Sequence, residues 1–443
     1  MKQFHDLGLA SSILRAVVAE GYETPTPIQA TVIPAMLASN DILALAQTGT
    51  GKTASFVLPL LDRLGPQRPA AKAKSCGALI LAPTRELAEQ IAVSIRTYGR
   101  FTRHSATVVV GGVKPGPQIR ALARGVDIVV ATPGRLLDHL GSGALHLNDT
   151  DIAVLDEADQ MLDLGFTPAI RKILGHIKGA RQTVLLSATM PKAIRRLAKE
   201  FLREPLEISV APASRTIERI NQKAVHVDKP GKRQALIDIL GGGDVERAIV
   251  FTRTKRGADK VNEYLQEAGL VTDALHGNKS QGQRRRTLAS FRSGKVKVLV
   301  ATDIAARGID VDDVSHVVNY ELPDLPEAYV HRIGRTARAG KSGIAVSLYD
   351  KSEQPLLHGI ERLIGRKLET PSSQIAARSQ GDDITPRKRS HKFADDKPSK
   401  RRRSKRHARG KPIPARSPST TPPKNGRGKP ARRGRSIDRH ATL

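Results

Sequence analysis

The most constraining feature of this sequence is a glycine- and threonine-rich run between an apolar segment and a helical pattern. The run reads Ala46-Gln47-Thr48-Gly49-Thr50-Gly51-Lys52-Thr53. Residues 42–45 before it are apolar, as in a buried strand, and residues 54–64 after it show helical spacing. A strand, a glycine-rich loop and a helix in this order form a phosphate-binding loop, because free N–H groups at a helix N-terminus attract anions.

Each residue type in this loop has a chemical reason to be there. Gly49 and Gly51 let the backbone turn tightly around phosphates. The ammonium of Lys52 is expected on the β- and γ-phosphates, and the Thr53 hydroxyl is expected on Mg²⁺. Ala46 stands where the general pattern has glycine, so the match is a relaxed one. The loop predicts ATP-type nucleotide and magnesium binding.

An acidic motif follows a second apolar segment, residues 152–155. It reads Asp156-Glu157-Ala158-Asp159. Ligands of open parallel sheets bind beyond the carboxyl ends of the strands, so these acids are predicted to face the phosphate loop. Asp156 is suited to hold Mg²⁺ through water, and Glu157 is suited to polarise an attacking water molecule.

Charge and cysteine content restrict the partners and the compartment. The 443 residues carry a net charge of +30, and from Pro371 onward 22 are Lys or Arg and 5 are Asp or Glu. This balance predicts a polyanionic partner, with nucleic acid first and an anionic membrane surface second. The only cysteine, Cys76, excludes an internal disulfide framework. Without a signal-like or membrane-length apolar run, we expect a soluble, cytoplasmic protein with no membrane partner.

Short apolar runs alternate with helical patterns twice along the chain, which predicts an α/β fold with two parallel-sheet domains. The predicted strands are 42–46, 78–82, 107–110, 128–131, 152–155 and 184–187, and then 248–251, 271–275, 297–301, 314–319 and 344–348. The polar interval 211–219 is the predicted boundary, and the interface of the two domains is the expected place of chemistry. The basic tail lacks apolar residues for a core and is predicted to be disordered.

A further motif precedes the phosphate loop: Gly21-Tyr22 followed by Thr24-Pro25-Thr26-Pro27-Ile28-Gln29. With this motif, the phosphate loop and the acidic motif, the chain resembles a DEAD-box ATP-dependent RNA helicase from residue 1 to about 368. The resemblance implies an adenine-recognition segment (1–30), two tandem RecA-like domains (31–210 and 217–368) and a Lys/Arg-rich tail (369–443). It implies that Gln29 reads the edge of adenine and that Phe4 stacks on the base. A glutamine amide suits adenine because it donates and accepts at once.

The resemblance also assigns residues to hydrolysis and to its coupling with RNA. Arg335 and Arg338 are implied to reach the γ-phosphate as arginine fingers, and residues three apart share a face if they lie on a helix. Gly308 is implied to lie near the phosphates and Asp310 near the ATP ribose. The implied coupling residues are Asp159, Ser187, Thr189 and His331.

The implied RNA contacts come from small motifs that follow predicted strands or open helices. Amides, hydroxyls and arginines at such places can hold successive phosphates. These residues are Pro83, Thr84, Arg85, Gly111, Gly112, Thr132, Pro133, Gly134, Arg135, Thr252, Arg253, Gln281, Arg284, Thr302 and Asp303. Nothing among them resembles a base-reading set, so we expect sequence-independent binding of single-stranded or short duplex RNA.

The implied function is RNA-stimulated ATP hydrolysis that separates short RNA duplexes or remodels RNA–protein complexes. An ATP-gated RNA clamp, an RNA chaperone acting through the tail and a DNA helicase are the alternatives. Asn278, where many members have Asp, and the basic tail both resemble the bacterial RhlE-type group. The tail is either an RNA tether or a solubilising extension. Ribonucleoprotein or RNA-decay components are candidate partners, and the RNA, the pathway and the oligomeric state stay open.

Overall fold

The computed structural model describes residues 3–46, 49–65, 69–210, 219–306, 314–337 and 342–369. All described residues belong to one compact unit within Met1–Asp383. The predicted disorder of the tail and the predicted boundary up to residue 218 lie outside the described residues. No helix within the described ranges combines the length and the apolar character of a membrane span.

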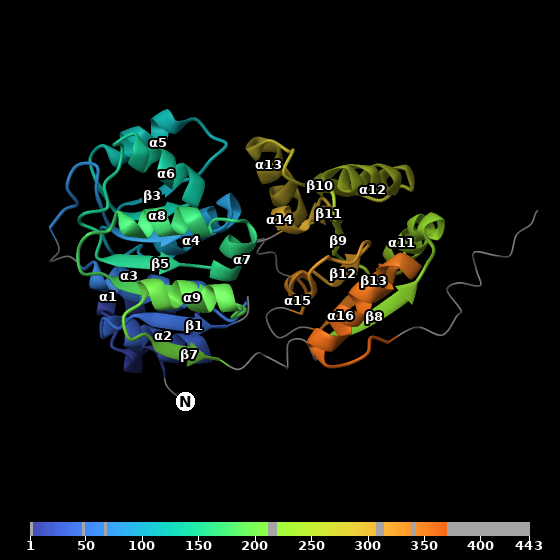
Figure 1. Cartoon of the computed structure of the whole chain (residues 1–443), viewed down its shortest axis with the longest axis horizontal. Helices are drawn as coiled ribbons and strands as arrows, with labels where there is room; N and C mark the ends of the chain where they lie inside the picture. The colour runs from blue at the N-terminus through green and yellow to red at the C-terminus, as the bar shows by residue number, and fades with distance from the viewer. Residues whose placement is uncertain are drawn as a thin grey trace, which may run out of the picture. The chain divides into compact units, whose positions relative to one another are not determined.

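The first sheet has seven parallel strands in the order β3-β4-β2-β5-β6-β1-β7 (Figure 1). Their bounds are β1 Ile42–Leu45, β2 Cys76–Leu81, β3 Ala106–Val109, β4 Val126–Ala131, β5 Ile152–Leu155, β6 Gln182–Ser187 and β7 Leu206–Ser209. The strands β5, β6 and β1 are neighbours in this order. The segments that follow them therefore meet at one edge of the sheet, where ligands of parallel sheets bind.

Helices cover both faces of this sheet. They are η1 Phe4–Leu7, α1 Ser11–Ala19, α2 Pro27–Leu37, α3 Lys52–Arg63, α4 Arg85–Tyr98, α5 Pro115–Leu122, α6 Pro133–Gly141, α7 Ala158–Asp163, α8 Thr167–Gly175 and α9 Lys192–Phe201. Ile80 packs into a core with α1 to α4, and its neighbour Leu79 packs into another with α5 to α9. Alternate strand residues enter opposite cores because successive side chains of a strand point to opposite faces.

The second sheet has six parallel strands in the order β10-β11-β9-β12-β13-β8 (Figure 1). Their bounds are β8 Ile220–His226, β9 Ala248–Thr252, β10 Thr272–Leu275, β11 Val298–Thr302, β12 His316–Asn319 and β13 Gly343–Tyr349. The helical elements are η2 Lys229–Gly231, α11 Lys232–Leu240, α12 Lys255–Glu267, α13 Gln281–Arg292, α14 Asp303–Ala306, α15 Pro326–Ile333, η3 Lys351–Glu353 and α16 Gln354–Ile364.

This sheet also has cores on both faces. Val250 packs with α11 and α12, whereas its neighbour Phe251 packs with α13 and α14. A further core lies under α15 and α16. The predicted α/β class with two parallel-sheet domains is confirmed.

Every predicted strand is present, with bounds that shift by up to two residues. The strands β7 and β8 were not predicted. Each lies at an edge of its sheet, and β7 buries only Ile208 while polar Asn221 and Lys223 interrupt β8. An edge strand that buries few side chains shows no apolar run in the sequence, so the apolar pattern misses it.

Candidate active site

The phosphate loop, the acidic motif and Ser187 lie at the carboxyl ends of three adjacent strands. Ala46 follows β1, Asp156 follows β5, and Ser187 ends β6, which lies between these two strands. The backbone N–H of Ala46 donates to the Ser187 carbonyl at 3.0 Å, which joins two of these ends directly. The predicted meeting of the two nucleotide motifs at one sheet edge is confirmed.

The loop itself has the backbone of an anion site. Gly49 and Gly51 have φ values of 80° and 87°, a conformation that glycine adopts without strain, and α3 begins at Lys52. Lys52 is 7% exposed, and its Nζ has no hydrogen-bond partner among the described residues. A buried ammonium without a partner is costly, so an anionic ligand such as a phosphate chain fits here. Gln47 and Thr48 lie outside the described residues.

The adenine-recognition segment is tied to this loop through Gln29. Its Oε1 accepts the Thr26 N–H at 2.9 Å, and its Nε2 donates to the Gly51 carbonyl at 3.2 Å. A Cβ atom at Gly51 would lie 2.5 Å from the Gln29 Nε2. Phe4 is 5% exposed and packs in the core with α1 and α2. Contact of Gln29 and Phe4 with adenine stays a prediction.

Glu157 is a strained and buried carboxylate. It has a φ of 52° and ψ of 52°, the left-handed region that costs a non-glycine residue about 1–2 kcal/mol. Burial, and then the neighbouring Asp156 charge, raise the pKa of Glu157 to about 7, although Lys52 and Arg335 act in the opposite direction. A carboxylate with a pKa near neutrality suits proton transfer at physiological pH. Its Oε2 has no hydrogen-bond partner within the described ranges.

Magnesium would need few protein ligands at this site. In the described part of the chain, no three His, Cys, Asp or Glu side chains gather to hold a metal ion. Mg²⁺ at phosphate sites keeps several waters and takes one or two carboxylates together with substrate phosphates. The carboxylate of Asp156, which is 2% exposed, and the Thr53 hydroxyl at the start of α3 fit that requirement.

The predicted coupling residues lie together. The Oδ2 of Asp159 accepts the N–H groups of Ala188 and Thr189 at 3.1 and 2.8 Å and the Thr189 hydroxyl at 2.9 Å. The Ser187 hydroxyl donates to the Thr189 carbonyl at 2.6 Å. The His331 Nε2 lies 3.9 Å from the same Asp159 oxygen. The end of the acidic motif is therefore bonded to the segment that follows β6.

Arg335 does not lie on a helix, so the condition for a helix face shared with Arg338 is not met. The helix α15 ends at Ile333, and the backbone at Ala337 has a φ of 56°, which a right-handed helix cannot contain. Arg335 is nevertheless buried, at 4% exposure, and its charge acts on Glu157. The other three residues predicted near ATP in this half, Arg338, Gly308 and Asp310, lie outside the described residues.

Several predicted RNA contacts from distant parts of the sequence meet around Glu86. Its Oε1 accepts Arg284 Nε at 2.8 Å and Gln281 Nε2 at 3.3 Å. The Arg85 Nη1 donates to the Gln281 Oε1 at 3.2 Å. Glu86 directly follows Arg85 in the sequence, but its bonding to Gln281 and Arg284 was not predicted. Its acidic charge next to the arginine of a predicted RNA-binding motif was the available signal.

The paired glycines 111 and 112 make room for Arg85. A Cβ atom at Gly112 would lie 1.9 Å from the Arg85 Nη1, and the φ of 71° at Gly112 also favours glycine, so a side chain there would be strained and would displace this guanidinium. On the far side of the pair, the Arg135 Nη1 donates to the Val113 carbonyl at 3.1 Å. The remaining predicted contacts in the first domain lie at the starts of α4 and α6: Pro83 and Thr84, and Thr132, Pro133 and Gly134.

In the second domain, Thr252 and Thr302 end β9 and β11 and Arg253 follows β9. The Asp303 carboxylate, a predicted RNA neighbour, is bonded to Arg332 at 2.5 and 2.7 Å. Arg332 is 1% exposed, and sequence reasoning gave it no role. A charged residue beside the apolar Ile333 on α15 was the signal that could have found it.

Two family models match the chain. The DEAD/DEAH box helicase model matches residues 26–197, and the model of the helicase conserved C-terminal domain matches residues 231–340. These segments contain the nucleotide motifs of the first sheet and the arginine motif of the second. The two sheets are thus the tandem RecA-like domains of a helicase.

Known proteins agree with these models. The DEAD-box ATP-dependent RNA helicase CshA of Bacillus subtilis (strain 168) is 42% identical over 366 residues, which cover 83% of this chain and 73% of that protein. S. cerevisiae Dbp5 bound to RNA and ADP BeF3 superposes with a TM-score of 0.76 at 32% identity, covering 86% of this chain and 98% of that one. Mss116 bound to ssRNA and UDP-BeF also gives 0.76, at 28% identity, covering 85% and 82%. The chain belongs to the DEAD-box family of ATP-dependent RNA helicases.

Proposed function

We propose that this chain hydrolyses ATP in an RNA-stimulated manner and separates short RNA duplexes locally, without sequence specificity. The observation that carries the proposal is the buried Lys52 ammonium beside Asp156 and Glu157, at the carboxyl ends of β1 and β5, the two strands that flank β6. This arrangement supports phosphoryl transfer from ATP to water. The RNA in the Dbp5 and Mss116 complexes supports RNA as the nucleic acid.

The nucleotide would be held by the loop 46–53 and the adenine-recognition segment. The N–H groups before α3 and the Lys52 ammonium would bind the phosphates, and Gln29 and Phe4 would recognise adenine. Thr53 and Asp156 would hold Mg²⁺, which supplies neutralisation of phosphate charge when bound. The hydrogen bond from Gln29 to Gly51 supports communication between base recognition and the phosphate loop.

In the hydrolysis step, a water oxygen bonds to the γ-phosphorus while the bond to the β,γ-bridging oxygen breaks, giving ADP and phosphate. Glu157 would orient this water and accept its proton, as the raised pKa of this carboxyl allows. Arg335 and Arg338 would stabilise the charge on the transferring oxygens. Losing an arginine finger costs about 10³–10⁵ in kcat.

RNA binding would be coupled to this step through the residues around Asp159. The carboxylate joins the acidic motif to Ala188 and Thr189, and His331 from the second domain lies near it. The RNA-side residues listed above would hold a single strand by its phosphates and 2′-hydroxyls. Closure on ATP and RNA together would bend that strand and open a short duplex.

The helicase and the clamp are separated by a strand-separation assay on a short RNA duplex. The helicase separates it with ATP and loses this activity with Lys52→Ala. A clamp leaves the duplex paired but retains RNA in a non-hydrolysable ATP analogue.

A chaperone that acts through the tail is a second candidate, favoured by the 22 basic residues beyond residue 370. The annealing activity of such a chaperone would survive Lys52→Ala and would disappear when the chain is truncated at Pro371.

Three narrower assignments belong to the same proposal. We infer RhlE-type membership from Asn278 and the basic tail, and higher core identity to RhlE than to CshA sequences would test it. Ribonucleoprotein or RNA-decay components are proposed as partners. A cytoplasmic location is proposed from the single cysteine, Cys76, which is buried and forms no internal disulfide.

A further inference from the structure

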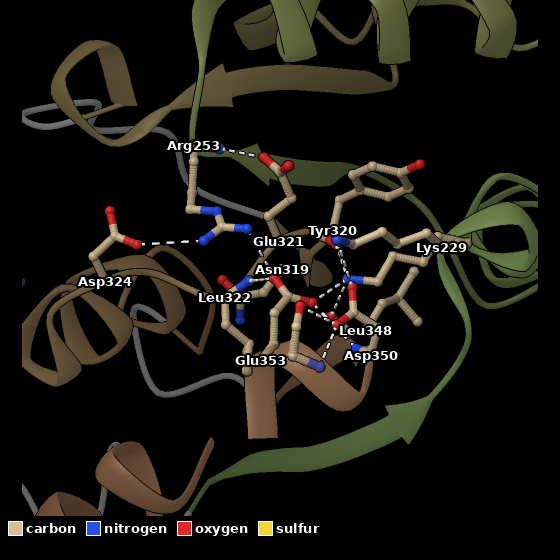
Figure 2. A network of polar contacts seen from close by, with 12 residues as sticks. Lys229, Arg253, Asn319, Tyr320, Glu321, Leu322, Asp324, Leu348, Asp350 and Glu353 are labelled. Carbon is tan, nitrogen blue, oxygen red and sulfur yellow. Dashed lines mark hydrogen bonds and ion pairs between the residues drawn. The ribbon is translucent and has the colours of Figure 1, made fainter. Parts of the chain in front are cut away.

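Glu353 lies at the centre of a polar network in the second domain, and Arg253 is one of its outer members (Figure 2). The Glu353 side chain is 3% exposed. Its Oε1 accepts the Arg253 Nη2 at 3.3 Å and the Leu322 N–H at 3.2 Å. Its Oε2 accepts the Asp350 N–H at 3.2 Å and the Lys232 Nζ. Each carboxylate oxygen therefore has two donors.

Lys232 neutralises this carboxylate inside the protein. Its side chain is 5% exposed, and its Nζ also donates to the Tyr320 and Leu348 carbonyls at 3.1 Å each. The three ammonium protons thus have three acceptors. A buried ion pair persists only when such additional hydrogen bonds satisfy both groups. Because Lys232 balances the Glu353 charge, the contact with Glu353 does not by itself neutralise Arg253.

Arg253 itself is held from three directions. Its backbone N–H donates to the Glu321 Oε2 at 2.7 Å, and its Nη1 donates to the Asp324 Oδ1 at 3.3 Å. The contact of Nη2 with Glu353 is the inner one, because the Asp324 side chain is 77% exposed and the Glu353 side chain is buried. The Arg253 side chain is 34% exposed. The two carboxylates occupy only part of a guanidinium that has five N–H donors.

We propose that Glu353 is a positioning residue that holds Arg253 in the orientation in which it binds an RNA phosphate. The inference rests on the proposed function, in which Arg253 contacts RNA. A guanidinium prearranged by a buried carboxylate loses less conformational freedom on binding than a free surface arginine. The rival interpretation is that Glu353 only stabilises the fold by pairing with Lys232.

The test measures RNA affinity against salt, in a non-hydrolysable ATP analogue, together with thermal unfolding. The variants are Arg253→Gln, Glu353→Gln and the pair Lys232→Met with Glu353→Leu. The buried ion pair of Lys232 and Glu353 is the hub of this network. The paired replacement removes both charges of the hub, so no buried charge is left unpaired, and such a replacement often preserves stability. Asp324→Asn is the matched control, because it removes only the exposed partner of Arg253.

If Glu353 positions Arg253, both hub variants weaken RNA binding as Arg253→Gln does. The slope of log affinity against log salt concentration then becomes shallower by about 0.7, the value for one phosphate contact of a single strand. Adding Glu353→Gln to Arg253→Gln causes no further loss, and Asp324→Asn keeps the wild-type slope. These effects appear well below the unfolding temperature of each variant.

Wild-type affinity and slope in the folded hub variants, alongside weakened binding by Arg253→Gln, would leave Glu353 a purely structural role. An unchanged slope in Arg253→Gln, with RNA still stimulating hydrolysis, would overturn the inference but not the helicase function. Loss of RNA stimulation in the wild-type chain would instead overturn the proposed function itself.

Discussion

The Oδ2 atom of Asp159 lies 2.8 Å from the backbone nitrogen of Thr189, which donates a hydrogen bond to it. Asp159 lies in the first turn of α7, two residues after Glu157, and Thr189 follows the neighbouring strand β6. A change in the conformation of the acidic motif must therefore either move the segment after β6 or break this hydrogen bond. The bond connects the motif that contains Glu157 physically to the rest of the sheet edge.

Asp159→Asn tests this route. The substitution replaces a carboxylate that accepts from four donors by an amide with one acceptor oxygen, at a cost of about 1–3 kcal/mol in the free energy of unfolding. We expect ATP hydrolysis to be retained in part while the number of duplexes separated per ATP falls. Thr189→Ser keeps the hydroxyl donor and serves as the control. Equal losses of hydrolysis and strand separation in Asp159→Asn would argue against a coupling role.

Lys52→Ala and Glu157→Gln should fail at different steps. Without the Lys52 ammonium the phosphates lose their buried counter-charge, so both nucleotide binding and turnover are lost. Glu157→Gln preserves shape and removes the base, so kcat falls by about 10²–10⁴ while ATP binding stays largely intact. Binding of a fluorescent ATP analogue and steady-state hydrolysis measure the two effects. Near-normal turnover in Glu157→Gln would show that another group is the base.

The raised pKa of Glu157 predicts a pH effect on stability with a definite sign. In the unfolded chain this carboxyl ionises near pH 4.3, and in the folded chain its pKa is about 7. Between these values the folded state binds more protons, so the group's contribution to stability falls as pH rises. Glu157→Gln should therefore raise the unfolding temperature relative to wild type at pH 8 more than at pH 5. The reverse order would mean that Glu157 is ionised in the fold at low pH.

Gly51→Ala should damage the phosphate loop through two independent effects. The φ of 87° strains any side chain, and the added Cβ would lie 2.5 Å from the Gln29 Nε2. We expect ATP affinity to fall at least as much as in Gln29→Ala, which removes only the amide. Gly49→Ala is the comparison. Gly49 has a similar φ of 80°, but a Cβ atom added there would meet no described residue within 4 Å apart from its chain neighbours. Equal effects of the two glycine variants would show that the Gln29 contact is unimportant.

Removal of residues 371–443 separates the tail from the helicase core. The tail carries 22 Lys and Arg residues, so as a tether it should contribute strongly to the salt dependence of RNA binding. We expect weaker RNA binding and a shallower salt slope, with RNA-stimulated hydrolysis kept at saturating RNA. Affinity and slope unchanged by truncation would leave the tail a solubilising role.

How far the sequence reaches depends on where each residue acts. The loop at Lys52 and the acids after β5 were predictable from the sequence. A central strand is a continuous apolar run, so the end of the run shows where the strand ends, and ligands of parallel sheets bind there. The edge strand β7 buries only Ile208, and β8 buries the polar Gln222 between Ile220 and Ala224, so neither strand shows an apolar run. The hub at Glu353 joins residues up to 121 positions apart, and nothing local to an isolated glutamate announces such contacts.

The arginine motif shows a different limit. Arg335 was predicted to act at the nucleotide site, and its charge acts on Glu157. The condition for a shared helix face is not met because the chain leaves the helix at Gly334 and takes a positive φ at Ala337. Spacing rules hold only while the helix continues, and the end of a short helix is hard to locate from composition alone.

The most direct test of the central claim is steady-state ATP hydrolysis by the purified chain without nucleic acid, with single-stranded RNA and with DNA of the same sequence. We expect that RNA raises the rate and that DNA does not, because closure on a strand with 2′-hydroxyls completes the active site. Equal rates in all three conditions would contradict RNA-stimulated hydrolysis, since the ATPase would then not depend on RNA.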